Sequence, residues 1–475
     1  MSKVQPDNTL QAIISHAKEY GFVFPSSEIY DGLSAVYDYG PYGAQLKKNI
    51  RDYWWNSMTQ LNENIVGIDA AIFMHPTTWK ASGHVDSFSD PLIDNKESKK
   101  RYRVDHLIEG HADALIAKGN NAAADKLLAD MDALLAKEDF EGLKKLIEEN
   151  KITCAVSGTS NWTEIRQFNL MFSTEIGAVA EEASTIYLRP ETAQGIFVNF
   201  LNVQKTARMK IPFGIAQTGK AFRNEIVARQ FIFRMREFEQ MEMQFFIKPG
   251  TQKEWYEHWK NERMNWHLSL GIAPEKYRFH DHIKLAHYAD AALDIEYEFP
   301  FGFKEVEGIH SRTDFDLTRH QEFSKKKMQY FDTEINQHYV PYVIETSIGL
   351  DRMFLLILAN SYEEETINKE DGTTDSRVVL HLPARLAPNK LAILPLTKKD
   401  GLPELAKELM DDCKKSFHCF YEEKDAIGKR YRRQDAIGTP FCVTIDHQTK
   451  EDGTATIRYR DSMLQERIAL SKIKE

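Results

Sequence analysis

The chain has 475 residues, of which 42% are hydrophobic, 28% charged and 11% aromatic, and its formal net charge is −10. This length exceeds what one hydrophobic core usually serves, so we expect two or three domains, and the composition excludes a disordered or fibrous protein. The negative charge excludes a uniformly basic coat for nucleic acid, although a local basic patch can still supply phosphate contacts.

The N-terminal third combines predicted helices with a composition shift. Residues 9–19 have a helical pattern, and the GPYG turn at residues 40–43 is followed by apolar side chains at helical spacing. Residues 107–150 are rich in Ala, Leu, Lys and Glu. Their apolar stripe consists of Leu127, Leu128, Met131, Leu134 and Leu135 and predicts a helical insertion. A solvated helical hairpin that only packs on the main body explains this stretch as well as a binding role does.

The middle of the chain predicts an antiparallel sheet. Residues 210–225 and 231–247 read as two unusually long strands, joined by a loop at the polar break IVARQ. Residues 251–269 return to helix, and residues 293–315 are again strand-like. The segment PYVIETSIGLDRMFLLILANSY predicts a strand, a glycine break and a buried helix.

A linker separates this region from the end of the chain. Pro383 and Pro388 mark the linker, after which LAILPL, FHCFYEE and FCVTID are strand candidates that alternate with helical patterns. Such alternation predicts a small α/β domain. We therefore expect an α+β protein with a main domain over residues 1–106 and 151–386, the helical insertion at 107–150, and a C-terminal α/β domain at 387–475.

Cysteine usage and apolar runs indicate a protein of a reducing compartment. The four cysteines contain no C-x-x-C pair and form no disulfide framework. The N-terminal segment lacks the basic and apolar stretches of a secretory signal. The longest strongly apolar run, residues 353–359, is far shorter than the roughly 20 residues of a membrane span. We expect a cytoplasmic protein with no membrane partner.

The second long strand carries an unusual set of side chains on one face. Because strand side chains alternate, one face of residues 231–247 should present Arg234, Arg236, Phe238, Gln240, Glu242 and Gln244. The preceding strand adds Arg223 and Glu225, which share one parity. Arginine offers a planar fork for phosphate oxygens, phenylalanine a stacking surface, and glutamate an acceptor for an amino group. A surface sheet with mixed charge pairs explains the same spacing, so a nucleotide site is one of two interpretations.

The segment ETSIGLDR favours the nucleotide interpretation. Gly349 allows a close backbone approach to a ligand, and Arg352 lies in the first turn of an apolar helix. An arginine at a helix N-terminus opposes the helix dipole, so we expect it to face an anion. An arginine that extends from the helix edge into solvent is the alternative.

These segments resemble the class II aminoacyl-tRNA synthetases. FRNE followed by RMREF is similar to their motif 2, GLDR followed by an apolar helix to motif 3, and YGPYGAQLKKNI to motif 1, which forms the dimer interface in that family. RPETAQGIF, FRNEI, FEQMEMQFF and GLDR together resemble the glycyl-tRNA synthetases of the homodimeric type. The likeness covers nearly the whole chain and includes a C-terminal anticodon-binding domain. It implies a class II antiparallel catalytic sheet flanked by helices.

The resemblance implies that ATP, Mg²⁺, glycine and tRNA(Gly) bind to a homodimer. Arg223, Glu225 and Arg352 would be catalytic, with Arg223 on the α-phosphate, Glu225 on the adenine amino group and Arg352 on the triphosphate. Arg234 would reach the γ-phosphate, Phe238 would stack on adenine, and Glu305 would hold Mg²⁺. The implied ATP site comprises Arg223, Asn224, Glu225, Phe233, Arg234, Met235, Arg236, Glu237, Phe238, Glu305, Val306, Gly349, Leu350, Asp351 and Arg352.

The implied glycine site overlaps the ATP site. It comprises Arg103, Glu191, Phe238, Glu239, Gln240, Met241, Glu242, Glu345, Thr346, Ser347, Ile348 and Gly349. Glycine has no side chain to recognise, so recognition must rest on its ammonium group, for which glutamates are natural partners. An added methyl group would meet a filled pocket at a cost of roughly 1–3 kcal/mol, so we expect no separate editing domain.

The resemblance does not decide two features of the chain, namely the missing cysteine pairs around the insertion and a basic run near the C-terminus. Relatives often carry C-x-x-C and C-P-x-C-G pairs around the insertion, but the corresponding stretches here read DNKESKKRYRVDH and TCAVSGTSN. Only Cys154 remains, so we expect no structural zinc. The basic run KRYRRQD, residues 429–435, is either a phosphate contact for the tRNA or a solvated charged segment.

Other functions remain open at this point. A catalytically silent synthetase-like protein that binds nucleic acid would keep the fold but lose the ATP-binding residues. A class II synthetase for serine, threonine or proline is the second alternative, against which the glutamates of RPET and FEQMEM favour glycine.

Overall fold

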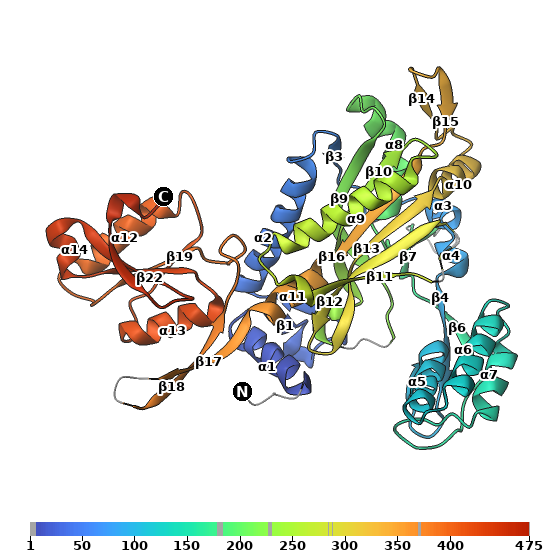
Figure 1. The fold of residues 1–475 in the computed structure, drawn as a ribbon, viewed down its shortest axis with the longest axis horizontal. Helices are drawn as coiled ribbons and strands as arrows, with labels where there is room; N and C mark the ends of the chain where they lie inside the picture. The colour runs from blue at the N-terminus through green and yellow to red at the C-terminus, as the bar shows by residue number, and fades with distance from the viewer. Residues whose placement is uncertain are drawn as a thin grey trace.

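The computed structural model describes residues 6–177, 184–226, 230–283, 285–286, 288–368 and 372–474. Its largest element is a seven-stranded sheet in the order β11-β12-β13-β16-β10-β9-β3, antiparallel throughout except for the β9–β3 pair (Figure 1). The strands are β11 (Tyr277–Asp281), β12 (Ala291–Phe299), β13 (Gly302–Thr313), β16 (Tyr342–Gly349), β10 (Glu237–Ile247), β9 (Phe213–Phe222) and β3 (Ile65–Gly67). The predicted antiparallel sheet is therefore confirmed.

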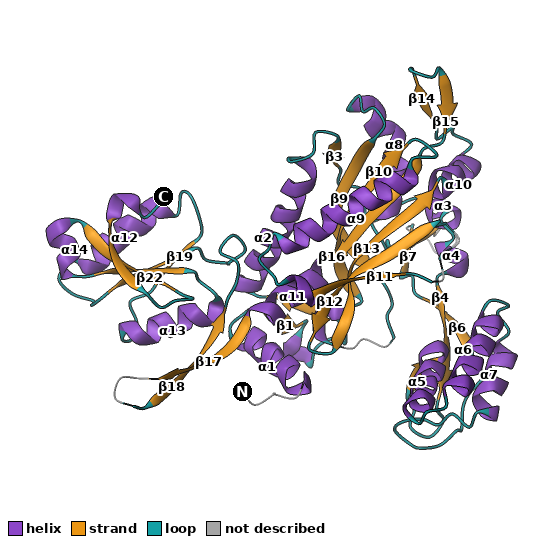
Figure 2. Ribbon diagram, in the orientation of Figure 1, coloured by secondary structure: helices purple, strands orange, loops and turns teal. Residues whose placement is uncertain are grey.

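One face of this sheet is an apolar core. Met241, Met243 and Phe245 of β10 and Ile344 and Ile348 of β16 are all at most 1% exposed. Three helices cover this face, namely α2 (Pro41–Thr59), α9 (Gln252–Leu268) and α11 (Leu350–Ser361), with α1 (Pro6–Glu19) packed beside them (Figure 2). The predicted helices at 9–19, after residue 43, at 251–269 and after Gly349 all correspond to these elements.

The opposite face is polar in its middle and apolar at one end. The register pairs Glu242 with Ser347 and Gln244 with Glu345, so the side chains of these four residues share that face. At the end of the strands, α8 (Ala193–Thr206) and α10 (Phe315–Ser324) cover a second apolar cluster that includes Phe213 and Phe246. The sheet therefore offers a row of polar side chains between two packed regions.

The long strands are shorter than the sequence pattern predicts. β9 ends at Phe222 and β10 begins at Glu237, so Arg223, Glu225, Arg234 and Arg236 lie beyond the strands, and the prediction that Arg234 and Arg236 continue the face of Phe238 is wrong. The chain is not extended between the two strands. Gln230 and Phe231 have φ angles of 67° and 59°, and the short η2 turn (Phe231–Phe233) leads toward β10. Residues 227–229 of the predicted polar break lie outside the described residues.

The insertion is a separate unit with its own core (Figure 1). It contains α5 (Val104–Ala117), α6 (Asn121–Leu135) and α7 (Phe140–Glu149) beside the sheet β5-β4-β6, formed by β4 (Ser89–Asp94), β5 (Arg101–Arg103) and β6 (Arg166–Asn169). Leu127 and Met131 of the predicted stripe are buried there with Trp162. The described insertion is thus three helices closed by strands rather than a helical hairpin.

The remaining elements between α1 and β16 are short. Before the insertion lie β1 (Val23–Pro25), η1 (Glu28–Tyr30), β2 (Tyr37–Tyr39), α3 (Pro76–Ala81) and α4 (His84–Ser87). After it come β7 (Ser173–Ile176), β8 (Ser184–Tyr187), η3 (Pro274–Lys276) and the hairpin of β14 (Tyr330–Asp332) and β15 (Gln337–Tyr339). Among the described residues, no helix is both long enough and apolar enough to span a membrane.

The C-terminal domain has a five-stranded mixed sheet in the order β20-β19-β21-β22-β23. β19 (Leu391–Pro395), β20 (Cys419–Tyr421) and β21 (Phe441–Ile445) match the three predicted strands, whereas β22 (Thr454–Tyr459) and β23 (Gln465–Ala469) were not predicted. The helices are α12 (Leu402–Cys413), α13 (Ile427–Ile437) and α14 (His447–Asp452), and the described chain ends with the short η4 turn (Leu470–Lys472). A hairpin of β17 (Tyr362–Asn368) and β18 (Thr374–Leu380) precedes this domain.

Candidate active site

A polar cavity of ≈ 140 Å³ lies where the segment before β10 meets the junction of β16 and α11. We call it the ATP cavity, after the site that the sequence resemblance predicts there. It is lined by Arg223, Glu225, Ile232, Phe233, Arg234, Met235, Phe238, Glu239, Gln240, Glu305, Ser347, Gly349, Asp351 and Arg352. Of these residues, only Ile232 lies outside the two predicted substrate sets. The structure thus brings together residues from three distant parts of the sequence.

Arg352 reaches across the ATP cavity from the first turn of α11. Its Nε donates to the Phe233 carbonyl at 3.2 Å, and its Nη1 lies 3.0 Å from the carboxylate of Glu305. The guanidinium carbon is 4.3 Å from the centroid of the Phe233 ring. The charge of Arg352 and its hydrogen bond lower the pKa of Glu305, so the two side chains form an ion pair.

Arg223 and Phe238 form the opposite part of the cavity. The guanidinium carbon of Arg223 lies 5.3 Å from the Phe238 ring and 5.4 Å from the Phe88 ring. Its Nε donates to the Pro190 carbonyl at 3.1 Å. The aromatic side chain of Phe238 is only partly buried and therefore offers a ring face at the cavity. An arginine held over an aromatic ring is suited to a nucleotide, because the guanidinium can bind phosphate and the ring can stack on the base.

Glu225 and Arg234 complete the entrance of the cavity. The two side chains lie 3.6 Å apart, between Arg234 Nη1 and Glu225 Oε2. Arg234 also lines a second cavity of ≈ 680 Å³, which we call the insertion cavity because α5 forms one of its walls. Phe233 and Arg234 line both cavities, so the two cavities adjoin each other.

Three carboxylates lie next to the ATP cavity on the polar face, and we call them the carboxylate cluster. Glu242 and Glu345 are 2% and 4% exposed, and Glu191, just before α8, is largely buried. Gln244 Nε2 donates to Glu242 Oε1 at 3.0 Å and to Glu345 Oε2 at 2.7 Å. The Thr192 hydroxyl donates to the other oxygen of Glu242.

Gln240 connects this cluster with the ATP cavity. Its Oε1 accepts a hydrogen bond from the Thr192 amide at 3.1 Å, and its Nε2 donates to Ser347 Oγ at 3.3 Å. Because Gln240 and Ser347 also line the ATP cavity, a small ligand held by the carboxylates would meet the phosphates of a nucleotide.

Basic side chains balance two of the three carboxylates. Arg312 Nη1 lies 3.0 Å and His310 Nδ1 2.9 Å from Glu345, and together they lower the pKa of Glu345 although burial alone would raise it. His84 Nε2 lies 3.3 Å from Glu191. Burial would also raise the pKa of Glu191, but His84 and the charge of Arg312 lower it to about 2. In contrast, burial and the neighbouring Glu345 raise the pKa of Glu242 well above its usual value.

A buried ion cluster anchors the site to α2. Lys47 Nζ lies 2.6 Å from Asp351 Oδ1 and 3.4 Å from Glu239 Oε2. Arg51 Nε lies 2.6 Å from the other oxygen of Glu239, and Tyr39 donates its hydroxyl proton to Asp351. The carboxylates of Glu239 and Asp351 therefore have partners on α2 and β2, and they position the strand and helix that carry Phe238 and Arg352.

Comparisons with known proteins agree with this geometry. A family described as the tRNA synthetase class II core domain (G, H, P, S and T) matches residues 172–361, and the anticodon binding domain matches residues 390–475. Proteins named glycine–tRNA ligase are 56% identical in Chlorobaculum tepidum and 50% identical in Treponema denticola, each over 468 residues. These alignments cover 98% of this chain and 98% and 95% of the two relatives.

The chain belongs to the glycine–tRNA ligase family. The predicted family, the class II fold and the enzyme class, an aminoacyl-tRNA synthetase, are thereby confirmed. The glycyl-tRNA synthetase insertion domain 1 matches residues 90–130 and 117–170, which is a wider range than the helical stretch 107–150. This range includes the strands that close the helical unit.

Several predicted site residues of this ligase-family chain have side chains in the apolar core. Met235, Met241, Val306, Ile348 and Leu350 belong to the main apolar core. Their side chains pack on α2, α9 and α11, and their neighbours in sequence face the cavity.

Five other predicted residues do not contact the carboxylate cluster. Thr346 is 1% exposed and shares the core face with Ile348. Glu237 pairs with Lys220, Asn224 donates its amide to the Leu170 carbonyl, and Arg236 donates to the Glu225 and Ser34 carbonyls. Arg103 binds Asp90 at 3.2 Å and lines the insertion cavity.

Sequence reasoning missed the basic partners of the site. Lys47, Arg51, Arg312 and His310 were not singled out, because each is an isolated residue in an element predicted for other reasons. The one available signal is the spacing of Arg312 and Asp316, whose side chains pair at 2.8 Å in the sequence SRTDFD. A basic residue and an acidic residue four positions apart predict only a local pair, not its contact with Glu345.

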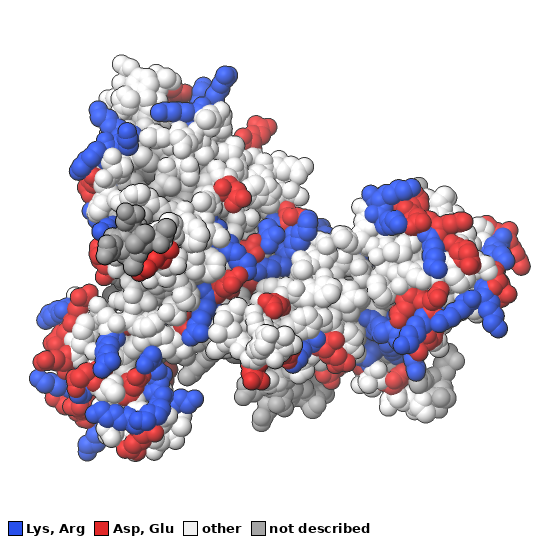
Figure 3. Space-filling view, turned by 180° about the vertical axis from the view of Figure 1, so that it is seen from behind, with Lys and Arg blue, Asp and Glu red and all other residues white. Residues whose placement is uncertain are grey.

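The basic run at residues 429–435 is engaged within the protein. Arg430 is 1% exposed and donates to the carbonyls of Pro395, Leu396 and Glu422. Arg432 pairs with Asp375, and Arg433 pairs with Glu422 and Asp425. Arg430 therefore faces neither solvent nor a tRNA phosphate, whereas for the partly exposed Arg432 and Arg433 the two interpretations stay predictions. On the face in Figure 3, basic side chains are interspersed with acidic ones.

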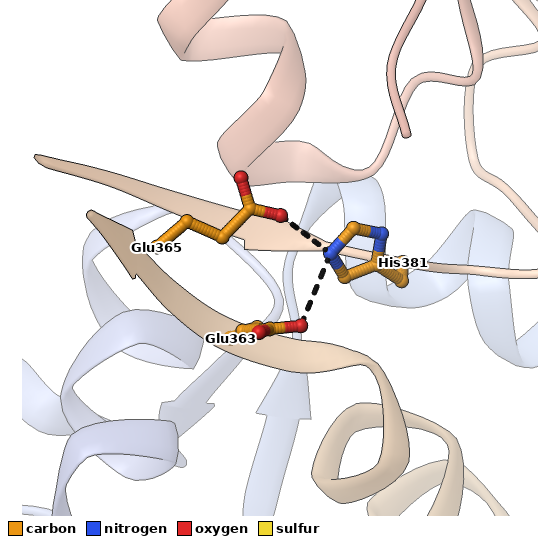
Figure 4. Close-up of side chains that lie close together, drawn as sticks. All are labelled: Glu363, Glu365 and His381. Carbon is orange, nitrogen blue, oxygen red and sulfur yellow. Dashed lines mark hydrogen bonds and ion pairs between the residues drawn. The ribbon is translucent and has the colours of Figure 1, made fainter. Parts of the chain in front are cut away.

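A group with the spacing of metal ligands lies at the C-terminal hairpin, away from the ATP cavity. Within the described ranges, Glu363, Glu365 and His381 form the one group whose ligand atoms all lie within 4.8 Å of each other (Figure 4). His381 Nδ1 also lies 2.6 Å from Asp461, and this hydrogen bond raises the pKa of His381 although burial alone would lower it. These contacts join the imidazole to two carboxylates of β17 and to one of the C-terminal domain.

Proposed function

We propose that the protein activates glycine with ATP to glycyl-adenylate, releases pyrophosphate, and transfers the glycyl group to the 3′ end of tRNA(Gly). The observation that carries this proposal is the direct connection between an arginine-lined cavity and a carboxylate cluster through Gln240 and Ser347. The first suits a triphosphate and the second suits an ammonium group, and the relatives named glycine–tRNA ligase match the chain from end to end.

In the first step the carboxylate of glycine attacks the α-phosphate of ATP. Both reactants are anionic, so their approach needs positive charge that is already in place. We propose that Arg223 binds the α-phosphate and Arg352 the rest of the triphosphate, while Phe238 stacks on the adenine and Glu225 accepts from its amino group. Arg234 at the cavity entrance would bind the γ-phosphate. Positioning and charge stabilisation then suffice, and no covalent intermediate on the protein is needed.

We propose that Glu305 holds the Mg²⁺ ion that accompanies ATP. Its carboxylate is 47% exposed at the wall of the ATP cavity and is a hard oxygen donor of the kind that Mg²⁺ prefers. Mg²⁺ would neutralise charge on the phosphate oxygens. Because Arg352 contacts the same carboxylate, the protein would hold both positive charges on the same side of the triphosphate.

Glycine would bind with its ammonium group in the carboxylate cluster and its carboxylate toward the ATP cavity. The polar face around Glu242 and Glu345 is almost fully buried, so it has no room for a side chain. A methyl group added to the substrate would press on Gln240, Gln244 or Ser347, which are already joined in hydrogen bonds. Exclusion of alanine by size is therefore our proposal, without a separate editing domain.

We propose that the insertion cavity receives the acceptor end of the tRNA. It is lined by Arg103, His106, His111, Arg234 and Lys304, and it adjoins the ATP cavity at Phe233. Cationic and aromatic side chains of this kind bind single-stranded nucleic acid through its phosphates and bases. The C-terminal domain would bind the anticodon stem and loop, as its family match suggests.

We further propose a cytoplasmic homodimer. Ile29, Tyr30 and Leu33 are 87%, 79% and 57% exposed in the loop that precedes β2 and α2. Exposed apolar side chains that gather on one loop are typical of an interface with another subunit. The same loop supplies the Ala35 carbonyl that binds the Arg236 amide, so an ordered interface would also support the ATP cavity.

Glycine-dependent exchange between ATP and pyrophosphate tests the function. We expect glycine to stimulate the exchange, and serine, alanine and proline to give at most a small fraction of that rate. The catalytically silent alternative predicts no stimulation by any amino acid. Stimulation by serine or proline instead of glycine would contradict the substrate assignment but keep the enzyme class.

A further inference from the structure

Glu242 stands apart from the other carboxylates of the site. Glu345 faces Arg312 and His310, and Glu191 faces His84, but no Lys, Arg or His nitrogen among the described residues lies within 4.0 Å of Glu242. Its hydrogen-bond donors are the neutral side chains of Thr192 and Gln244. A carboxylate that is 2% exposed and has no cationic partner is expensive to keep charged.

One side-chain amide bridges Glu242 and Glu345, because Gln244 Nε2 donates to Glu242 Oε1 at 3.0 Å and to Glu345 Oε2 at 2.7 Å. Two ionised carboxylates held this close repel each other, and burial adds to the cost of keeping both charged. When carboxyl groups approach this closely, they share one proton, and the pair titrates in two separated steps. Because Glu242 is buried and has no cationic partner, the free site favours one proton on this pair.

The charges around the pair do not remove this preference. The groups that face it from the surrounding elements are Glu191, Asp316, His84, Arg189, Tyr288, His310 and Arg312. Arg312 also binds Asp316 at 2.8 Å, and the guanidinium of Arg189 donates to the carbonyls of Lys220 and Ala70. Both arginines are thus already engaged elsewhere, and neither contacts Glu242.

We propose that the free protein holds one proton on the Glu242–Glu345 pair, and that the ammonium group of glycine displaces it. This inference rests on the proposed function and adds a proton to its first binding step. The protonated protein and zwitterionic glycine form the glycine complex and one released proton, so charge and atoms balance. The three N–H groups of the ammonium then take the place of the single shared proton as donors to the carboxylates.

The exchange explains how a fully buried anionic pocket can exist before its substrate arrives. The exchange also favours ligands with a small cationic group. If a neutral ligand of the same size displaced the proton, it would leave the two carboxylates without a cationic donor. Glycinamide keeps the ammonium and lacks the attacking carboxylate, so it should bind the pocket with the same proton release and without exchange.

The test is the pH dependence of glycine affinity together with a direct proton count. Calorimetric titrations of the full chain with glycine, at saturating MgATP analogue in buffers of different ionisation enthalpy, report the protons released per glycine bound. We expect release of up to one proton at neutral pH. The apparent Kd should fall about tenfold per pH unit until the shared proton is lost in the free protein as well.

A substitution separates the shared proton from other titrations. Glu242→Gln removes one carboxyl group, so glycine should bind more weakly, and with no proton release and little pH dependence. Glu298→Gln, which removes a surface carboxylate paired with Lys276, is the matched control and should behave like the wild type. The proton count on the unaltered chain decides the question even where Glu242→Gln does not fold.

The outcomes distinguish this inference from the proposed function. Glycine binding and glycine-dependent exchange without proton release would overturn the proton displacement and leave the ligase assignment intact. A chain that binds no glycine and shows no exchange would overturn both.

Discussion

Arg352 has the most direct structural connection to the proposed chemistry at the level of single residues. Its guanidinium spans the ATP cavity between the Phe233 ring and the Glu305 carboxylate, 4.3 Å from the ring centroid. Replacing Arg352 by alanine should lower glycine-dependent exchange about 10²–10³-fold, because a preorganised charge partner of a transition state contributes about that much. Initial rates of pyrophosphate exchange measure this loss.

The control for this prediction is another arginine that is paired on the same sheet. Arg278 on β11 binds Glu296 at 2.6 Å, is half exposed and lines neither cavity. Arg278→Ala should keep wild-type exchange, and both variants should unfold within a few degrees of the wild type. Equal exchange rates in the two variants would contradict the role of Arg352.

Single residues also mark the limit of what the sequence could predict. The grouping of Arg223, Phe238 and Arg352 followed from motifs, and all three side chains line one cavity. The sequence did not predict that the side chains of Glu239 and Asp351 point toward Lys47, because Lys47 lies on a helix far away in the sequence. A sequence pattern assigns a side chain to one face of its own strand, whereas the partner on that face depends on the packing of the whole domain.

At the scale of elements, two tight turns meet at the base of the insertion. Asn95 and Ser98 belong to one turn, and Cys154 and Ser157 to the other. Ser98 Oγ lies 3.2 Å from Cys154 Sγ, and Ser157 Oγ donates to Asn95 Oδ1 at 3.0 Å. Burial would raise the pKa of Cys154, but hydrogen bonds from Ser157, Ser98 and Tyr102 lower it to about 6. Both pairs have the x₂ spacing of zinc-binding cysteines.

This arrangement predicts that a zinc site can be restored. The triple substitution Asn95→Cys, Ser98→Cys and Ser157→Cys should bind one zinc ion per chain with Cys154 as the fourth ligand, because tetrahedral Zn²⁺ needs sulfurs at about 2.3 Å from a common centre. Elemental analysis after purification should find zinc in the variant and none in the wild type. Stoichiometric zinc in the wild type would contradict the prediction that hydrogen bonds alone join these turns.

Elements with strong local patterns were the ones that the sequence predicted. The helices after residues 43 and 349 and strands β9, β10, β13 and β16 all have clear periodicity or a glycine break. The hairpin β17–β18 was missed, because its strands YEEETIN and TDSRVVL are charged and the run joins a helix without a break. Its stability comes from tertiary contacts, which propensity does not encode.

At the scale of the whole molecule, this hairpin connects the catalytic and C-terminal domains. Arg377 of β18 is 3% exposed and binds Asp435 of α13 at 3.0 Å, and Arg458 of β22 binds the same carboxylate at 2.8 Å. A buried carboxylate between two arginines leaves little freedom for rotation of the domain. We infer that the anticodon-binding domain is fixed relative to the catalytic sheet through β17 and β18.

His381 forms a second connection between the domains, and its contribution depends on pH. Its Nε2 lies 3.0 Å from Glu365 of β17, and its Nδ1 lies 2.6 Å from Asp461 of the C-terminal domain. The hydrogen bond to Asp461 raises the pKa of His381, although burial opposes this. A group whose pKa is raised on folding stabilises the fold fully below its unfolded-state value, about 6.5 for histidine, and that contribution is lost as the pH rises through the raised value.

Replacing His381 by glutamine should therefore lower the free energy of unfolding at about pH 6 and have a smaller effect at about pH 9. The loss at low pH should be at most about 1 kcal/mol, because Asp461 is largely exposed and solvent screens the pair. Urea unfolding of wild type and variant at both pH values measures the difference. His447→Gln, which alters an exposed histidine of the same domain, should leave the free energy of unfolding unchanged at both pH values. A loss in His381→Gln that is equal at the two pH values would show that the imidazole acts by packing rather than by its charge.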